Sequence, residues 1–147
     1  MKNSRRRARE FALQAIYQWL LNESAAENLL AQLQEQKEFP KADRALAEAL
    51  VRGVIGNADA LRGLLVPYLD REIKGLSPVE HALLLQSAFE LRDQLQTPYK
   101  VVINEAVELA KSFGGTDGHK YVNGVLDKLA AVLRPNESNT RRVSQGR

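Results

Sequence analysis

The sequence predicts an all-α fold of about seven helices, arranged as two small helical bundles packed together. Apolar residues recur every three to four positions along most of the chain, and no segment alternates convincingly between apolar and polar residues as a half-buried strand does. Capping residues, prolines and glycines divide this pattern into segments of helical length. With 147 residues, the chain is long enough to bury a real core.

Four of these helices are expected in the N-terminal half, over about residues 4–21, 24–36, 43–56 and 57–67. The first carries one broad apolar stripe from Ala8 to Trp19. Asp43 and Asn57 are candidate N-caps of the third and fourth helices. Pro67 should end or kink the fourth, because proline cannot continue the helical hydrogen bonding.

The clearest helix start in the chain is Ser77-Pro78-Val79-Glu80. It offers an N-cap, a proline at the first helical position and a glutamate placed for a capping box. The helix that follows is apolar nearly all round as far as Leu91. A helix without a polar face is buried by its neighbours, so we expect it at the centre of the fold.

Two further helices are expected in the C-terminal part. One opens at Thr97-Pro98 and closes at Gly114-Gly115, and the last is capped by Thr116 or Asp117 and stopped by Pro135. We therefore expect a single helical domain over residues 1–135, with subdomains of about 1–68 and 70–135, followed by a disordered basic tail over 136–147.

Positive charge is concentrated at the two ends of the chain. Residues 1–10 sum to about +4 and residues 134–147 to about +3, so the overall +3 leaves residues 11–133 at about −4. Charge placed this way suits a polyanion, because released counterions drive such contacts. Solubilising tails explain the charge distribution equally well.

Composition bounds the function further. The chain has no cysteine, so disulfides and thiolate metal or redox sites are excluded. It has no apolar run of membrane-spanning length and no apolar stretch like that of a signal peptide, so we expect a cytoplasmic protein that does not associate with membranes. Two histidines and no phosphate-binding loop argue against a metal site, a cofactor or catalysis.

Several blocks in the right order resemble the transcription antitermination factor NusB family. The first helix combines Arg5–Glu10 with Gln14–Trp19, and Pro67–Leu69 also falls in a family-like place. The longest match runs over Tyr99–Gly114 and His119–Asp127. Together these blocks extend over most of the chain.

The resemblance implies a NusB-like fold and a function without catalysis. The family binds the single-stranded boxA element of ribosomal RNA leader transcripts together with NusE, a small-subunit ribosomal protein. Other Nus factors join this complex on RNA polymerase, which then reads through terminators. Leu85 departs from the family pattern, which usually has arginine there, so a polar contact from that position is in doubt.

The basic N-terminus supplies the first candidate RNA contacts, because guanidinium groups bind phosphate oxygens in a fork and stay charged. On a helical wheel Arg6 falls on the polar side, whereas Arg9 lies beside the apolar stripe and is open to pairing with an internal carboxylate. With the matching block of the first helix, the candidates are Lys2, Arg5, Arg6, Arg7, Arg9 and Gln14.

A second group of candidate RNA contacts lies in the last helix, at Lys120, Tyr121 and Asn123. An aromatic ring beside a cation is a usual way to stack a base of single-stranded RNA. Gly124 costs about 1 kcal/mol inside a helix, so something should approach closely there. The alternative is a glycine at a tight helix crossing, with a half-buried tyrosine beside it.

Candidate contacts with the protein partner are Tyr17, Glu80 and Asp117. Tyr17 is an aromatic residue outside the apolar stripe, and the two carboxylates fall in the first turns of their helices. The resemblance places these positions at or beside the NusE contact, although Asp117 could simply cap the last helix.

Two other functions remain open. One is the RNA-targeting module related to the N-terminal domain of RNA cytosine methyltransferases, which would need a large catalytic domain. The other is a helical DNA-binding protein, although no short turn precedes an obviously basic recognition helix.

Overall fold

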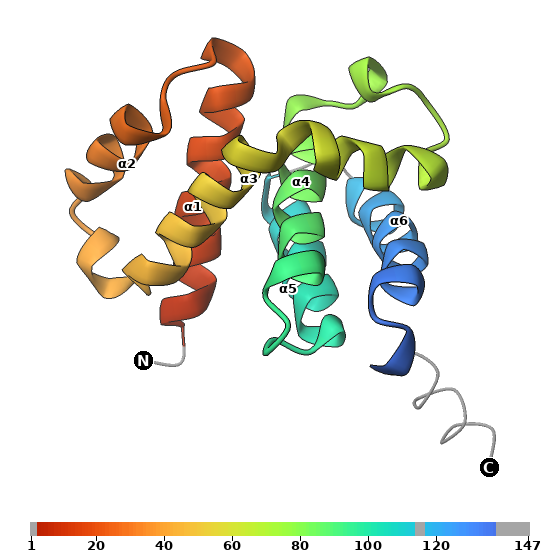
Figure 1. Ribbon diagram of the computed structural model, residues 1–147. Coiled ribbons are helices and arrows are strands. Elements are labelled where there is room, and N and C mark those ends of the chain that lie inside the picture. Colours follow the sequence, from red (N-terminus) through yellow and green to blue (C-terminus); the bar gives the residue numbers. More distant parts are fainter. Residues whose placement is uncertain (1–2, 114–116, 138–147) are drawn as a thin grey trace.

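A computed structural model describes residues 3–113 and 117–137, and these residues contain helices but no strand (Figure 1). The α-helices are α1 (Ser4–Asn22), α2 (Ala26–Gln34), α3 (Arg44–Leu65), α4 (Pro78–Asp93), α5 (Tyr99–Phe113) and α6 (Gly118–Leu133). Three short 3₁₀ helices are η1 (Phe39–Lys41), η2 (Val66–Tyr68) and η3 (Ile73–Gly75). The predicted all-α fold is confirmed.

The third and fourth predicted helices are joined in α3, which is kinked at Asn57 (φ −129°, ψ 19°). Counted on either side of this kink, the described part of the chain has the seven helices that were predicted. Asn57 was expected to cap the second half, but its side-chain amide donates to the carbonyl oxygen of Gly53 at 2.7 Å. It therefore closes the preceding turn.

The central helix is α4, as its all-round apolar sequence predicted. It packs against α1 and α3 on one side and against α5 and α6 on the other. Leu83, Leu84, Leu85 and Leu91 are fully buried. Leu85 is thus part of the core, which is consistent with an apolar residue at that position.

At Gly53 the backbone of α3 lies directly against the ring of Phe89 in α4. A Cβ atom built on Gly53 would lie 2.2 Å from ring atoms of Phe89, which is itself almost fully buried. A side chain at position 53 would clash with this ring, so glycine stands here although it lowers the stability of a long helix.

Side-chain caps hold the helix starts that the sequence indicated. Ser77 and Glu80 form the predicted capping box at the start of α4. Asp43 caps α3 by accepting a hydrogen bond from the backbone N–H of Leu46 at 3.0 Å. The predicted Gly114-Gly115 turn and the alternative cap Thr116 lie outside the described residues.

The first two residues of the predicted tail, 136 and 137, are helical in the structure. After α6 the chain bends at Arg134, and residues 135–137 are helical again. Glu137 accepts a hydrogen bond from the backbone N–H of Tyr99 at 3.1 Å and also pairs with Arg134. Residues 138–147 lie outside the described part.

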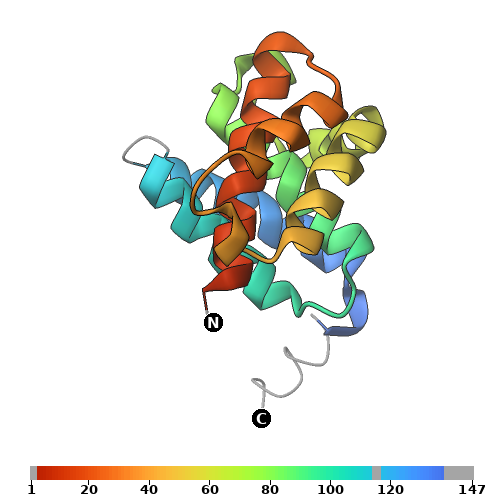
Figure 2. The ribbon, with the colours of Figure 1, turned by 90° about the vertical axis from the view of Figure 1, so that its left-hand side faces the viewer.

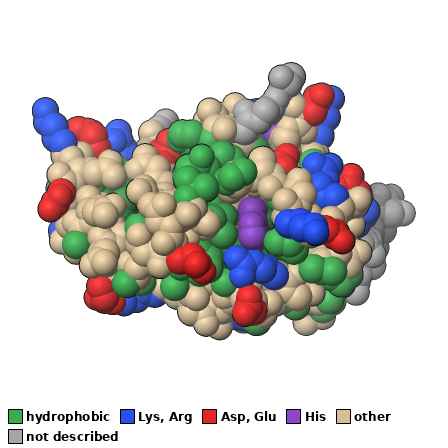
Figure 3. Space-filling model, turned by 90° about the horizontal axis from the view of Figure 1, so that it is seen from above, with side chains coloured by type: hydrophobic (Ala, Val, Ile, Leu, Met, Phe, Trp, Pro, Cys, Tyr) green, Lys and Arg blue, Asp and Glu red, His purple; other side chains and the backbone are tan. Residues whose placement is uncertain are grey.

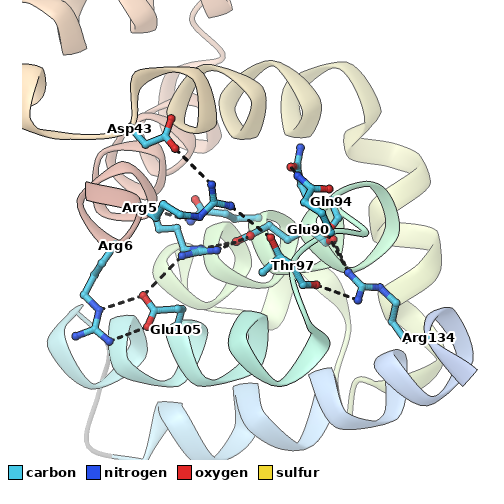
Figure 4. A network of polar contacts seen from close by, with 11 residues as sticks. Arg5, Arg6, Asp43, Glu90, Gln94, Thr97, Glu105 and Arg134 are labelled. Atoms are coloured by element: carbon cyan, nitrogen blue, oxygen red, sulfur yellow. Dashed lines mark hydrogen bonds and ion pairs between the residues drawn. The ribbon is translucent and has the colours of Figure 1, made fainter. Parts of the chain in front are cut away.

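Arg134 was counted in the charge of the basic segment 134–147, but it is an internal residue. Its guanidinium donates to the carbonyl oxygens of Glu90, Leu91, Gln94 and Thr97 at 2.7–3.2 Å. It thus ties together the carbonyls at the C-terminal end of α4 and in the turn that follows (Figure 4).

The helices share one continuous hydrophobic core, to which every α-helix contributes. The division into subdomains at about residue 68 stays a prediction, since α4 packs as closely on α1 and α3 as on its own neighbours α5 and α6. No helix in the described residues is both long and apolar enough to cross a membrane.

Candidate nucleic-acid interface

The first turn of α1 presents three exposed guanidinium groups, from Arg5, Arg6 and Arg7. This turn contains no acidic residue, and within the described residues the side chain of Asn3 does not cap it. A helix N-terminus carries a partial positive charge and free N–H groups. Arginines placed there add their charge to that of the helix end, although each lies within 3.4 Å of a carboxylate oxygen.

Arg6 is held by a carboxylate of another helix. Its Nε and Nη2 atoms donate to the two carboxylate oxygens of Glu105 in α5, at 3.0 and 2.7 Å (Figure 4). The hydrogen bonds and charge of Arg6 lower the pKa of Glu105, although partial burial opposes this shift. The pair is thus fully ionised near neutral pH.

Arg5 and Arg7 make longer contacts. Arg5 lies 3.4 Å from a carboxylate oxygen of Asp43 and donates to the hydroxyl of Thr97 at 3.3 Å. Arg7 lies 3.3 Å from a carboxylate oxygen of Glu38. Exposed pairs of this kind are worth little, on the order of 0–1 kcal/mol, so both guanidiniums can turn toward a ligand.

Arg9 is not available to RNA, and its inclusion among the RNA contacts is wrong. Its side chain is only 4 % exposed and forms a fork with Glu90, at 2.8 and 2.9 Å. Burial opposes the charge of Arg9, but the hydrogen bonds and charge of Glu90 outweigh it and raise the pKa of Arg9. Glu90 is therefore the internal carboxylate with which the sequence analysis allowed Arg9 to pair but which it did not identify.

The candidates in α6 lie away from the arginines. Figure 1 shows the first turn of α1 at the lower end of the molecule and the first turn of α6 at the upper end. Lys120 and Asn123 are exposed, and Lys120 lies 3.6 Å from the carboxylate of Asp117. The fold therefore does not gather all predicted RNA contacts into one site.

Tyr121 is half-buried, and its ring is already in contact with protein. Its hydroxyl accepts a hydrogen bond from the backbone N–H of Asp70 at 3.3 Å, and the guanidinium carbon of Arg71 lies 4.4 Å from the ring centre. A stacked base would have to displace Arg71 or use the other face of the ring.

Within the described residues no other helix approaches Gly124 closely. No heavy atom counted around it in the described residues, outside its own helix, lies within 4 Å of a Cβ atom built there. Gly124 is exposed, so a tight helix crossing does not explain it.

Two other predicted RNA contacts flank the arginines in sequence. Lys2 lies outside the described residues. Gln14 is exposed, but it faces a groove together with Tyr17 and accepts a hydrogen bond from the side chain of Gln36 at 3.2 Å.

The three predicted partner contacts lie around this groove. Tyr17 and Phe113 are 36 % and 46 % exposed, and with Val79 they line a groove of about 390 Å³. Glu80 follows Val79, and its Oε2 atom lies 3.4 Å from a Cβ atom built on Gly118, the residue after Asp117. Figure 2 shows the first turns of α4 and α6 on the same side of the molecule.

Two of these carboxylates already have intramolecular contacts. Glu80 belongs to the capping box with Ser77. Asp117 occupies the N-cap position of α6, but among the described residues its side chain pairs with Lys120 and accepts no capping hydrogen bond. Asp117 therefore remains more available than a capping carboxylate.

A second groove on the upper face was not indicated by the sequence. Figure 3 shows apolar side chains there beside basic ones. Leu21, which is 57 % exposed, lines it with Arg62 and His81, and its volume is about 580 Å³. Burial and the charge of Arg62 lower the pKa of His81 to about 4, so His81 is neutral at pH 7.

Sequence reasoning also missed the acidic partners of the arginines. Glu90 and Glu105 lie 81 and 99 residues from the arginines that they bind. The only available signal was a glutamate within the apolar face of α4. No cluster of three or more metal-binding side chains occurs in the described part of the chain.

Comparison with known proteins agrees with this architecture. The model of the NusB family matches residues 6–131. A transcription antitermination protein NusB from Paraburkholderia xenovorans is 56 % identical over 142 residues, which cover 97 % of this chain and 99 % of that protein. One from Burkholderia lata is 55 % identical over 141 residues, 96 % of this chain and 97 % of the relative.

Solved structures show the same fold. NusB of T. maritima is 30 % identical and superposes with a TM-score of 0.76, covering 88 % of this chain and 92 % of its own. A crystal structure of antitermination factors NusB and NusE in complex with double-stranded RNA gives a TM-score of 0.73 at 22 % identity, covering 90 % of this chain and 99 % of the matched one.

Proposed function

The chain belongs to the NusB family, and from this premise we propose that it binds boxA-type single-stranded RNA of ribosomal RNA leader transcripts jointly with NusE. In this role it promotes read-through by RNA polymerase, to which other Nus factors link it. The observation that carries the proposal is the first turn of α1, with three exposed arginines and no acidic residue.

RNA binding by this turn is an electrostatic event. Arg5, Arg6 and Arg7 replace carboxylate oxygens by phosphate oxygens, and the helix N-terminus adds its free N–H groups. Phosphate contacts carry no sequence information, so they position the RNA without selecting it. Selection must come from exposed polar side chains such as Asn123 or from the joint complex.

NusE is proposed to bind on a separate face, formed by Tyr17, Phe113, Glu80 and Asp117. Arg6 and Tyr17 are eleven residues apart on α1, which is about 16 Å along the helix axis. The apolar groove provides area to bury, and the carboxylates at its rim complement a basic ribosomal protein. The two ligands can therefore be held at the same time.

Fluorescence anisotropy with labelled nucleic acids tests the proposal. The ligands are a boxA-type RNA, a scrambled RNA, an RNA duplex and a DNA duplex, each with and without NusE. We expect the boxA-type strand to bind best and to gain most from NusE. Equal affinity for all four ligands, unchanged by NusE, would contradict it.

A face-specific pair of variants tests the division of labour. Tyr17→Asp and Glu80→Lys should weaken NusE binding, while RNA binding by the isolated protein stays near normal. If both variants abolish RNA binding and leave the NusE complex intact, the two faces are assigned the wrong way round.

A further inference from the structure

The arginine that is held most tightly at the proposed RNA site is bound by a carboxylate of the protein itself. Resting on the proposed RNA binding, we propose that Glu105 is an intramolecular competitor for RNA phosphate: it holds Arg6 in the free protein and lowers affinity for RNA of any sequence. Glu105 thereby regulates the same site without contacting the RNA, because it acts on RNA affinity by holding Arg6.

The geometry of the pair supports competition. Arg6 uses its Nε and Nη2 atoms on Glu105, which is an edge of the guanidinium that also engages phosphate in a fork. The Arg6 side chain is 51 % exposed, so a phosphate can reach it. A phosphate that takes this edge must displace Glu105, and one that takes another edge still meets its negative charge.

Glu105 is also fixed in place, whereas its arginine partner is not. Its side chain is only 14 % exposed, and its carboxylate lies 3.8 Å from the buried Arg9 as well. Arg9 therefore anchors Glu105 from the interior while Arg6 closes over it from the solvent side (Figure 4). A fixed carboxylate loses little side-chain entropy when it binds Arg6, which makes it a stronger competitor than a mobile surface glutamate.

The carboxylates beside the other two arginines are weaker competitors. Asp43 and Glu38 each contact their arginine through a single pair of atoms, at 3.4 and 3.3 Å, and their side chains are 30 % and 48 % exposed. Of the three carboxylates beside Arg5, Arg6 and Arg7, Glu105 is the one that combines a two-bond fork with burial. Its effect is to keep phosphate-only binding weak, so that additional contacts decide which RNA is retained.

The test is Glu105→Gln, which keeps the shape of the side chain but removes its charge. The matched control is Glu108→Gln, which removes the same charge from the same helix, where the carboxylate lies 3.6 Å from Lys111. RNA affinity is measured between 50 and 400 mM KCl with a boxA-type and a scrambled strand, and thermal unfolding verifies that both variants are folded.

We expect Glu105→Gln to tighten binding of both strands by about two- to fivefold at low salt, the weight of one surface ion pair. The salt dependence should steepen by up to about 0.7 in log K against log salt, one released counterion on a single strand. Glu108→Gln should change affinity less than Glu105→Gln. Equal effects of the two variants would mean that the gain in RNA affinity comes only from the change in net charge, and this would overturn the proposal.

The same substitution in an Arg6→Gln background isolates the pair. If Glu105 acts by holding Arg6, Glu105→Gln should bring no gain when Arg6 is already neutral. An unchanged gain there would overturn the proposal while leaving RNA binding at this site intact. Absence of RNA binding by both the unmodified protein and Glu105→Gln would instead overturn the proposed function, and this proposal with it.

Discussion

Replacing Arg9 should destabilise the protein strongly while leaving the three exposed arginines of the proposed RNA site in place. Arg9→Gln leaves the carboxylate of Glu90, which is 2 % exposed, without its cation in the core. Removing one partner of a buried ion pair costs about 3–5 kcal/mol, against a total stability of about 5–15 kcal/mol for a typical domain. With a urea dependence of about 2 kcal/mol per molar, the unfolding midpoint should fall by roughly 2 M.

Urea unfolding followed by circular dichroism measures this loss. Arg6→Gln is the matched control on the same helix, because it breaks an exposed fork and should cost no more than about 1 kcal/mol. The double variant Arg9→Gln, Glu90→Gln should be more stable than Arg9→Gln alone, since no charge is left buried.

RNA affinity per folded molecule separates the two roles. Arg9→Gln keeps the three exposed arginines, so its RNA affinity should change by no more than about fivefold, the effect expected of Glu105, which loses its neighbour at 3.8 Å. Arg6→Gln removes a phosphate contact and should bind more weakly. If Arg9→Gln is as stable as the unmodified protein and loses RNA binding, the reasoning that Arg9 is internal is refuted.

Three other outcomes follow from the packing. Gly53→Ala should lower the free energy of unfolding by about 1–3 kcal/mol in urea, because the new Cβ atom meets the buried ring of Phe89. Gly63→Ala, with open space around it, should instead raise it by about 0.4–1 kcal/mol. Equal effects of the two variants would contradict the close contact at Gly53. Because the pKa of His81 is lowered to about 4, the unfolded chain binds a proton on His81 between about pH 4 and 6.5 and the folded protein does not. The free energy of unfolding should therefore fall by about 1–2 kcal/mol from pH 7 to pH 5, and His81→Gln should reduce this fall. An unchanged pH profile in His81→Gln would place His81 in solvent. Tyr121→Ala should weaken RNA binding by about 1–3 kcal/mol if a base stacks there, and normal affinity per folded molecule with a large stability loss would make the ring a packing element only.

Features encoded by neighbouring residues were predictable from the sequence. The capping box at Ser77, the cap at Asp43 and the central position of α4 follow from residues within one helix and its first turn. The exposure of Arg6 followed from the same helical wheel that set Arg9 beside the apolar stripe.

Features that depend on distant residues were not predictable. The internal role of Arg134 was not visible in the sequence, where it counted only toward the charge of residues 134–147, because its carbonyl partners lie some 40 residues earlier, at the end of α4. A tight helix crossing was one of the two explanations for Gly124, and the open surroundings of this glycine rule it out for the described residues. The helical wheel separated Arg6 from Arg9, but which carboxylate each arginine binds is decided by tertiary packing and was seen only in the structure.

The salt dependence of RNA binding tests the central claim most directly. A variant with Arg5→Gln, Arg6→Gln and Arg7→Gln is compared with the unmodified protein on a single-stranded boxA-type RNA. The account predicts weaker binding at low salt and a slope of log K against log salt that is flatter by up to about 2, because three phosphate contacts are lost. Unchanged affinity and slope would contradict it and leave these arginines with a solubilising role.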